Sequence, residues 1–285
     1  MEKNYIKYLL ISLLIVVLLT GALNYLVDPL LYYQRDKRPF PVLYTEDQRF
    51  LIPGLIKNSR SMNTAIIGTS MAGIFRASDV SALLNEKTVK LTVNGATLLE
   101  QSYILSRYFD THPDAKRIIW VIDPMYVDLD PELFTIRSYN YPFFLYDHNK
   151  LNLKYLINYA VTTHSIQTII NGFSGIKFYM KTTNLDDIHT WPLDTKTGCK
   201  QIMENYNKMS SQHFEVLDPI LVPLTNFNEL NASINLNRIS ELAERRKDIQ
   251  IDLILPPYSI VRYLFENEKK GLNRILDARN ALASL

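Results

Sequence analysis

The stretch "TAIIGTSMAG", residues 64–73, joins a short apolar run to a glycine, a threonine and a serine. Apolar runs of this length that end in turn residues are typical of buried strands, so the sequence predicts a strand at 64–68. Gly68 allows a sharp turn after that strand. Ser70 then begins the next helix, where a serine is either a nucleophile or a polar cap. From the serine alone, capping is the better interpretation.

Similar apolar runs recur along the chain and determine the expected fold class. They are "TVKLTVN" (88–94), "RIIWVID" (117–123) and "IQIDLIL" (249–255). Between these runs lie segments whose apolar residues recur at helical spacing, at residues 78–85, 97–109 and 237–247. Ser78 or Asp79 is the expected cap of the first of these helices. Apolar strands that alternate with helices predict a parallel sheet covered on both faces. Right-handed crossovers make an α/β protein with a doubly wound, three-layer, flavodoxin-like sandwich the expected architecture.

The segment at residues 8–27, "YLLISLLIVVLLTGALNYLV", contains no charged residue and is about as long as a membrane-crossing helix. Lys3 and Lys7 precede it and no small-residue cleavage site follows, so we interpret it as an uncleaved signal anchor. Basic residues at 35–38 compete with Lys3 and Lys7 under the positive-inside rule. The short leading stretch favours residues 1–7 as a cytosolic tail, with the domain outside the cytoplasmic membrane.

Prolines interrupt residues 28–62, which we expect to form an extended connector to a domain at 63–285. Residues 124–230 are rich in Tyr, Phe and Asn without clear periodicity, and they are expected to form a helical insertion. Its tyrosines, among them Tyr139, Tyr141 and Tyr146, either line a carbohydrate-binding cleft or fill the insertion, because aromatic rings serve both purposes.

Composition narrows the possible functions. The 31 basic and 29 acidic residues give a net charge of +2 without a basic block, so nucleic acid is not an expected partner. Cys199 is the only cysteine, which excludes an internal disulfide and a cysteine-based zinc site. Asp128 and Asp130 lack histidines at ligand spacing, so a helix N-terminus explains them better than a metal site. No phosphate-binding glycine pattern follows the first strand, so no cofactor is expected and nucleotide binding is the least favoured function.

Functional groups of open α/β sheets gather at the carboxyl ends of the strands, and three predicted strand ends carry suitable residues. They are Gly68-Thr69-Ser70, Asn94-Gly95-Ala96 and Asp123-Pro124. Their order, with "NYLVDPLLYY" after the anchor, resembles the SGNH (GDSL-like) hydrolase superfamily, in the membrane-anchored branch that includes alginate O-acetylation proteins and the teichoic-acid D-alanine transfer protein. The resemblance implies Ser70 as nucleophile and Gly95 as oxyanion donor. Asp123 stands where the family has asparagine, and its role is open because a carboxylate would oppose an oxyanion.

The resemblance also implies an Asp-x-x-His base after the last strand. Here the chain stops at Leu285, and C-terminal truncation is the simplest expectation. Asp186-x-x-His189 has the right spacing, but it precedes the last strand by about sixty residues and is the less favoured base. The remaining histidines are expected to be solvated: His112, His148, His164 and His213.

The expected function is that of a membrane-anchored SGNH-like esterase or acyltransferase that acts on acyl groups of cell-surface polysaccharide, and that is inactive if the base is missing. Its expected partners are the lipid bilayer and either the polysaccharide or an acyl donor protein. The alternative is a non-catalytic anchored accessory protein that binds glycan or an acyltransferase partner through the Tyr-rich insertion. Asp123 and the absent base favour that alternative.

Overall fold

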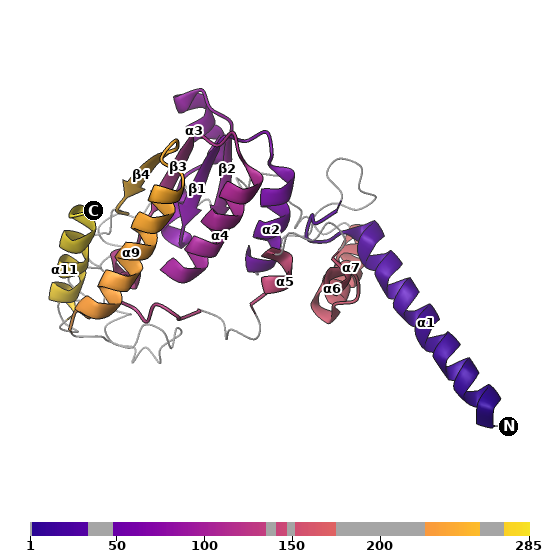
Figure 1. The fold of residues 1–285 in the computed structure, drawn as a ribbon. Helices are drawn as coiled ribbons and strands as arrows, with labels where there is room; N and C mark the ends of the chain where they lie inside the picture. The colour runs from indigo at the N-terminus through magenta and orange to yellow at the C-terminus, as the bar shows by residue number, and fades with distance from the viewer. Residues whose placement is uncertain (1, 34–47, 135–140, 147–151, 175–225, 257–270) are drawn as a thin grey trace.

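The computed structural model describes residues 2–33, 48–134, 141–146, 152–174, 226–256 and 271–285 (Figure 1). Its strands are β1 (Thr64–Gly68), β2 (Thr88–Thr92), β3 (Arg117–Val121) and β4 (Gln250–Ile254). Its helices are α1 (Glu2–Val27), α2 (Gln48–Asn58), η1 (Ser70–Ile74), α3 (Ala77–Leu84), α4 (Leu98–Thr111), η2 (Pro124–Tyr126), α5 (Phe143–Tyr146), α6 (Leu153–Leu156), α7 (Tyr159–Ser174), α9 (Glu229–Arg245) and α11 (Leu272–Ala283), of which η1 and η2 are 3₁₀ turns.

The strands form one parallel sheet in the order β2-β1-β3-β4. In the centre, Ile66 of β1 pairs with Lys90 of β2 and with Ile119 of β3, which in turn pairs with Asp252 of β4. This is the order of the first four strands in doubly wound flavodoxin-like proteins. The α/β class and the parallel sheet are therefore confirmed, and every strand lies within its predicted range.

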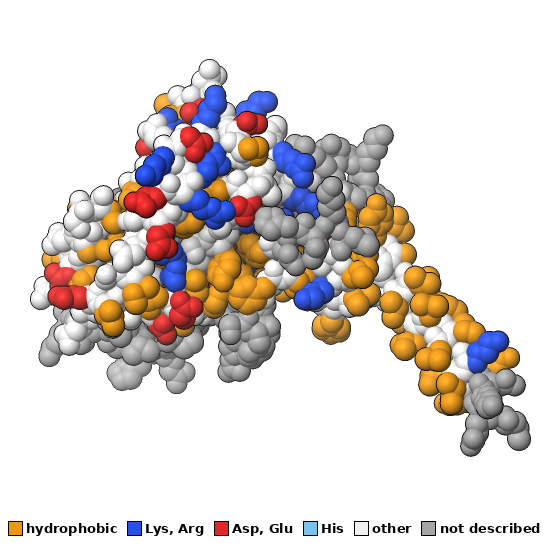
Figure 2. Space-filling model, viewed as in Figure 1, with side chains coloured by type: hydrophobic (Ala, Val, Ile, Leu, Met, Phe, Trp, Pro, Cys, Tyr) orange, Lys and Arg blue, Asp and Glu red, His pale blue; other side chains and the backbone are white. Residues whose placement is uncertain are grey.

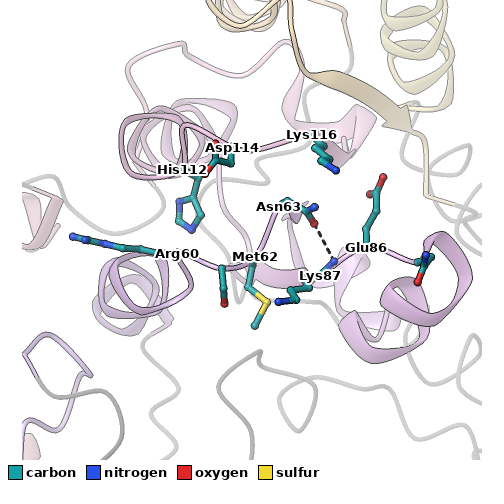
Figure 3. A pocket seen from close by; sticks show the side chains of 10 residues that line it. Arg60, Met62, Asn63, Glu86, Lys87, His112, Asp114 and Lys116 are labelled. Atoms are coloured by element: carbon teal, nitrogen blue, oxygen red, sulfur yellow. Dashed lines mark hydrogen bonds between the residues drawn. The ribbon is translucent and has the colours of Figure 1, made fainter.

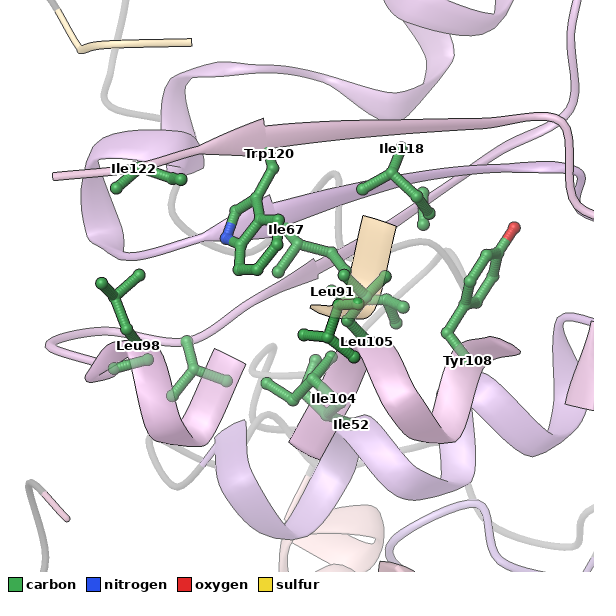
Figure 4. Packing of buried hydrophobic residues seen from close by; sticks show 14 of the residues in the cluster. Ile52, Ile67, Leu91, Leu98, Ile104, Leu105, Tyr108, Ile118, Trp120 and Ile122 are labelled. Atoms are coloured by element: carbon green, nitrogen blue, oxygen red, sulfur yellow. The ribbon is translucent and has the colours of Figure 1, made fainter. Parts of the chain in front are cut away.

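Helices cover both faces of the sheet because the strands are apolar on both sides. On one face, Ile67, Leu91 and Trp120 pack in a large core with residues of α2, α4 and α9 (Figure 4). The Trp120 indole Nε1 donates to Gln101 Oε1 of α4 at 2.7 Å, so the buried ring keeps a hydrogen bond. On the other face, Ile66 packs with residues of η1 and α3 in a smaller cluster.

The predicted helices are present, with one difference in a cap. Thr97 and Glu100 form a capping box at the start of α4, in which each side chain accepts from the other residue's backbone N–H. The expected cap of α3 was Ser78 or Asp79, but the helix begins at Ala77 and Arg76 is its cap residue. Ser78 and Asp79 lie exposed in its first turn instead, where an acidic side chain favours the helix dipole.

The expectation of an extended connector at 28–62 is wrong for residues 48–58, which form α2 with Pro53 inside it. Its apolar residues, Leu51, Ile52, Leu55 and Ile56, are all fully buried in the main core. Pro53 removes one backbone donor, but burial of four aliphatic side chains at helical spacing outweighs that loss. Helix α2 therefore belongs to the globular core.

Helix α1 projects from the α/β body (Figure 1), and residues Tyr5–Val27 are long and apolar enough to cross a membrane, with mean hydropathy 2.4 and 11% of the segment buried. Figure 2 shows hydrophobic side chains along its length. The buried Asp28 carboxylate follows the helix and accepts hydrogen bonds from the backbone N–H groups of Tyr32 and Tyr33, both at 2.8 Å. The Tyr155 hydroxyl of α6 also donates to it, at 2.7 Å. These bonds fix the end of α1 to the rest of the protein.

Candidate functional site at the carboxyl edge of the sheet

The three predicted site residues Ser70, Gly95 and Asp123 follow the carboxyl ends of β1, β2 and β3. Gly68, the last residue of β1, is paired in register with Thr92 of β2 and with Val121 of β3, so the three strands end at the same level. The Val93 N–H donates to the Gly68 carbonyl at 3.0 Å and continues the pairing of β1 and β2 beyond β2. The turns that carry Ser70 and Gly95 therefore start side by side.

Gly68 makes the turn that presents Ser70. Its φ of +152° is unusual for a residue with a side chain, and a Cβ there would lie 2.6 Å from the Val121 carbonyl oxygen and 2.8 Å from Ala72 Cβ. Thr69 then caps η1, because its Oγ1 accepts from the Met71 N–H at 3.3 Å. Ser70, half-buried, is the first residue of η1. Thr69, and not Ser70, is therefore the cap residue of η1.

A buried lysine lies beneath this turn. Lys90 of β2 is fully buried, and its Nζ donates to the Gly73 carbonyl of η1 at 2.7 Å. This hydrogen bond helps to hold η1 against β2. In the sequence, Lys90 is one polar residue within an apolar strand, and nothing in that pattern predicts its contact with η1.

Gly95 has a φ of +62°, in the left-handed region that glycine adopts without strain. Helix α2 holds the preceding residue, because the Asn94 N–H donates to Gln48 Oε1 at 2.6 Å and Arg49 Nη2 donates to the Asn94 carbonyl at 3.2 Å. A segment expected to be only a connector thus positions the Asn94-Gly95 turn.

Arg49 is itself fixed by a buried ion pair with Glu100 of α4. Arg49 Nε lies 3.0 Å from Glu100 Oε1 and Nη2 lies 2.9 Å from Oε2, while the two side chains are 9% and 1% exposed. Such a bidentate pair fixes direction as well as distance. Because Glu100 also accepts from the Thr97 N–H at 3.1 Å, the pair joins α2, the Asn94-Gly95 turn and the start of α4.

Asp123 begins η2, and its Oδ1 accepts from the Met125 N–H at 2.9 Å. The residue is 5% exposed. Asp123 therefore has a structural role as the cap of this turn. An ionised carboxylate accepts hydrogen bonds and does not donate to an oxyanion, so in that form Asp123 is not an oxyanion donor.

The expected base, His189, lies outside the described residues, as do His148 and His213. The expectation that His112 is solvated is wrong. It is 2% exposed at the C-terminal end of α4, where its ring stacks on Tyr108 with centroids 4.1 Å apart and its Nε2 lies 2.9 Å from the Ser59 carbonyl. Burial lowers the pKa of His112, which favours the neutral ring. His112 precedes β3 and so lies at the amino edge, opposite Ser70.

His164, the remaining described histidine, is half-buried in α7, with its ring centroid 6.3 Å from that of Phe50. It too differs from the solvated position expected for it. Helix α7 packs against α1, away from the sheet (Figure 1). Neither histidine described by the structure therefore follows the carboxyl end of a strand.

The amino edge carries an open, charged hollow of about 350 Å³ (Figure 3). Arg60, Lys87, Lys116, Glu86 and Asp114 line it together with His112. Its cations and carboxylates are mixed, and it lies across the sheet from Ser70. It shares no residue with the three strand-end turns.

Asp128 does lie at a helix N-terminus, that of α9, because its Oδ2 accepts from the N–H of the cap residue Asn228 at 3.2 Å. Its buried carboxylate forms a bidentate ion pair with Arg274 of α11, with Nε–Oδ2 at 2.8 Å and Nη2–Oδ1 at 2.6 Å. Asp130 is exposed and accepts from the Glu132 N–H at 3.0 Å. Among the described residues, no group of three or more His, Cys, Asp or Glu side chains is arranged to hold a metal ion.

Two of the tyrosines named as possible cleft residues, Tyr141 and Tyr146, pack against each other. Tyr141 is 4% exposed, and its ring stacks on that of Tyr146 with centroids 5.5 Å apart. Burial raises the pKa of Tyr141. The Tyr141 ring is therefore part of the interior, Tyr146 is half-buried beside it, and Tyr139 lies outside the described residues.

We compared the chain with protein-family models, with curated protein sequences and with solved structures, and nothing matches it in any of the three.

Proposed function

We propose that this chain is a membrane-anchored protein of the SGNH-like type that acts on acyl groups of cell-surface polysaccharide. In this proposal Ser70 carries the acyl group that is removed from the polysaccharide or transferred to it. The observation that carries the proposal is the position of Ser70 and Gly95 in adjacent turns at the carboxyl edge of one parallel sheet. This edge is where α/β proteins place their reactive groups. The same proposal puts α1 in the cytoplasmic membrane, with its N-terminus in the cytosol and the α/β domain outside.

In the proposed reaction, Ser70 Oγ attacks the carbonyl carbon of an ester while a base takes its proton. The backbone N–H groups of Ser70 and Gly95 stabilise the oxyanion that forms. Collapse of this intermediate expels the sugar hydroxyl, which receives the proton, and leaves the acyl group on Ser70. Water or a second hydroxyl then takes the acyl group by the reverse steps. His189 stays a candidate for the base, because the described histidines are elsewhere.

A serine-directed phosphonate probe tests the proposal in the full-length chain in detergent. We expect the probe to modify Ser70, identified by peptide mass spectrometry, and the Ser70→Ala variant to lose both this adduct and any hydrolysis of a chromogenic acetate ester. Ser61→Ala is the matched control, because Ser61 is exposed at the opposite edge of the sheet. A Ser70→Ala protein that keeps full esterase activity would remove Ser70 from the reaction.

One observation favours the accessory function instead. The Asp123 carboxylate lies at the third strand end, where the resemblance implies an oxyanion donor, and negative charge there disfavours an acyl-transfer intermediate. If the folded protein binds polysaccharide but the phosphonate leaves Ser70 unmodified, the accessory function is the better account.

A further inference from the structure

Helices α6 and α7 lie against the C-terminal end of α1 (Figure 1). Leu156 of α6 packs on Gly21, where an added Cβ would be 3.8 Å from Leu156 Cβ. The Asn24 amide donates to the Leu156 carbonyl at 2.8 Å and to Thr162 Oγ1 at 2.9 Å, and it accepts from Ser165 Oγ at 2.8 Å. Asn24 thus has partners for both its nitrogen and its oxygen, and α6 and α7 are held at a fixed height along α1.

Helix α7 buries polar side chains beside Val161 and exposes large apolar ones. Ser165 and Thr168 are fully buried, and Ser165 faces α1. On the opposite side of the helix, Tyr159, Ile166 and Ile170 are 87%, 46% and 59% exposed. Helices of water-soluble domains bury their apolar stripe and expose the polar one.

The exposed apolar surface continues onto α6 and the turn that follows it. Leu153 is 60% exposed and Ile157 is 56% exposed. We call the five residues Leu153, Ile157, Tyr159, Ile166 and Ile170 the α6–α7 apolar face. Figure 2 shows hydrophobic side chains along α1 and beside its C-terminal end, where this face lies.

The length of α1 sets the depth of this face. With a rise of 1.5 Å per residue, Asn24 lies about 26 Å from Lys7 along the helix. The hydrocarbon core of a bilayer is about 30 Å thick. If Lys7 lies at one boundary of the core, Asn24 is still at or inside the other boundary. Gly21, and with it Leu156, lies one turn deeper.

We propose that the α6–α7 apolar face is immersed in the interface of the lipid leaflet at which α1 leaves the membrane. Lipid is the occupant because Leu156, Thr162 and Ser165 contact Gly21 and Asn24 of α1, which places α6 and α7 at the depth where α1 leaves the membrane. Tyr159 suits the headgroup boundary, where tyrosine is enriched. Lys154, exposed between Leu153 and Ile157, can extend its ammonium to the headgroups. The inference rests on the membrane crossing of α1 proposed above and is independent of the chemistry of Ser70.

Spin labels in the full-length chain, reconstituted in phosphatidylcholine/phosphatidylglycerol nanodiscs, test this depth. Cys199→Ser removes the only native cysteine, and single cysteines then replace Ile157, Tyr159, Leu14 of α1 and Leu83 of α3. Leu14 is the lipid reference, and Leu83, which is 83% exposed on the α/β body, is the water reference. The readout is the ratio of collision rates with oxygen, which concentrates in lipid, and with a water-soluble nickel complex.

We expect the ratio at Ile157 and Tyr159 to be several-fold higher than at Leu83 but lower than at Leu14, because the interface is shallower than the middle of α1. A ratio at Ile157 equal to that at Leu83 while Leu14 reports lipid would overturn the immersion of α6–α7 alone. A water-like ratio at Leu14 as well would overturn both the immersion and the anchor. Dipolar broadening between labels at Ile157 would show that a second copy of the chain covers the face, which also contradicts lipid as the occupant.

Discussion

The ion pair between Arg49 and Glu100 makes the connection between α2 and the Ser70 edge testable. Arg49→Met keeps an unbranched apolar stem but removes two hydrogen bonds to Glu100 and one to the Asn94 carbonyl. The Glu100 carboxylate, 1% exposed, then loses its cation and keeps the Thr97 N–H as a neutral donor. Breaking one side of a buried pair costs about 3–5 kcal/mol in stability.

Urea unfolding of the full-length chain in detergent, followed by tryptophan fluorescence, measures this loss. Trp120 is a suitable reporter because it is buried and hydrogen-bonded to Gln101 of the same helix as Glu100. Glu100→Gln and the double variant complete a cycle, in which we expect a coupling energy of about 1–3 kcal/mol between the two sites. Arg245→Met is the matched control: it breaks a solvent-exposed pair with Asp110, whose loss costs at most about 1 kcal/mol.

The ion pair would be shown to have no structural role if Arg49→Met were no less stable than the control. If the effects of the two single variants were simply additive, Arg49 would act independently of Glu100, through packing or through its hydrogen bond to the Asn94 carbonyl. We also expect Arg49→Met to reduce the rate of phosphonate labelling at Ser70, because the Asn94-Gly95 turn loses one of its two hydrogen bonds to α2. Unchanged labelling would separate the stability of this turn from the reactivity of Ser70.

Two further predictions concern Gly68 and His112. Gly68→Ala should lower the free energy of unfolding by about 1–3 kcal/mol, because φ is +152° and the new Cβ would lie 2.6 Å from the Val121 carbonyl oxygen. Urea unfolding measures this loss, with Gly21→Ala as the control because its Cβ would meet only Leu156, at 3.8 Å. Equal stabilities of the two variants would refute the prediction. Burial lowers the pKa of His112 below 6.5 in the folded protein. On acidification the unfolded chain therefore binds a proton at a higher pH than the folded chain does. The contribution of the neutral ring to stability is present above pH 6.5 and is lost as the pH falls below that value. His112→Gln should therefore flatten the decline in urea midpoint from about pH 7.5 to about pH 5.5, and an equally steep decline would contradict a neutral buried ring.

Local patterns were enough to predict much of the fold. Each strand is a run of about five residues whose apolar character is visible in the sequence, and its crossover helix shows its own spacing. The candidate site followed from the same information, because residues after parallel strands meet at one edge whatever their distance along the chain. The apolar composition of α1 likewise needs no tertiary contact to be recognised.

Only the tertiary structure decided which polar residues hold these elements together. Arg49 and Glu100 are 51 residues apart, and Asp128 and Arg274 are 146 apart, so no local spacing indicates that they pair. His112 looked like a loop residue because its sequence neighbours are polar, yet it is buried between the end of α4 and Ser59. The sequence by itself determined the strands, the crossover helices and the membrane-length helix, since these depend on interactions within a few residues. The tertiary structure alone decided the long-range ion pairs, the contacts of α2 and the placement of α6 and α7 on α1, since these depend on which distant segments become neighbours.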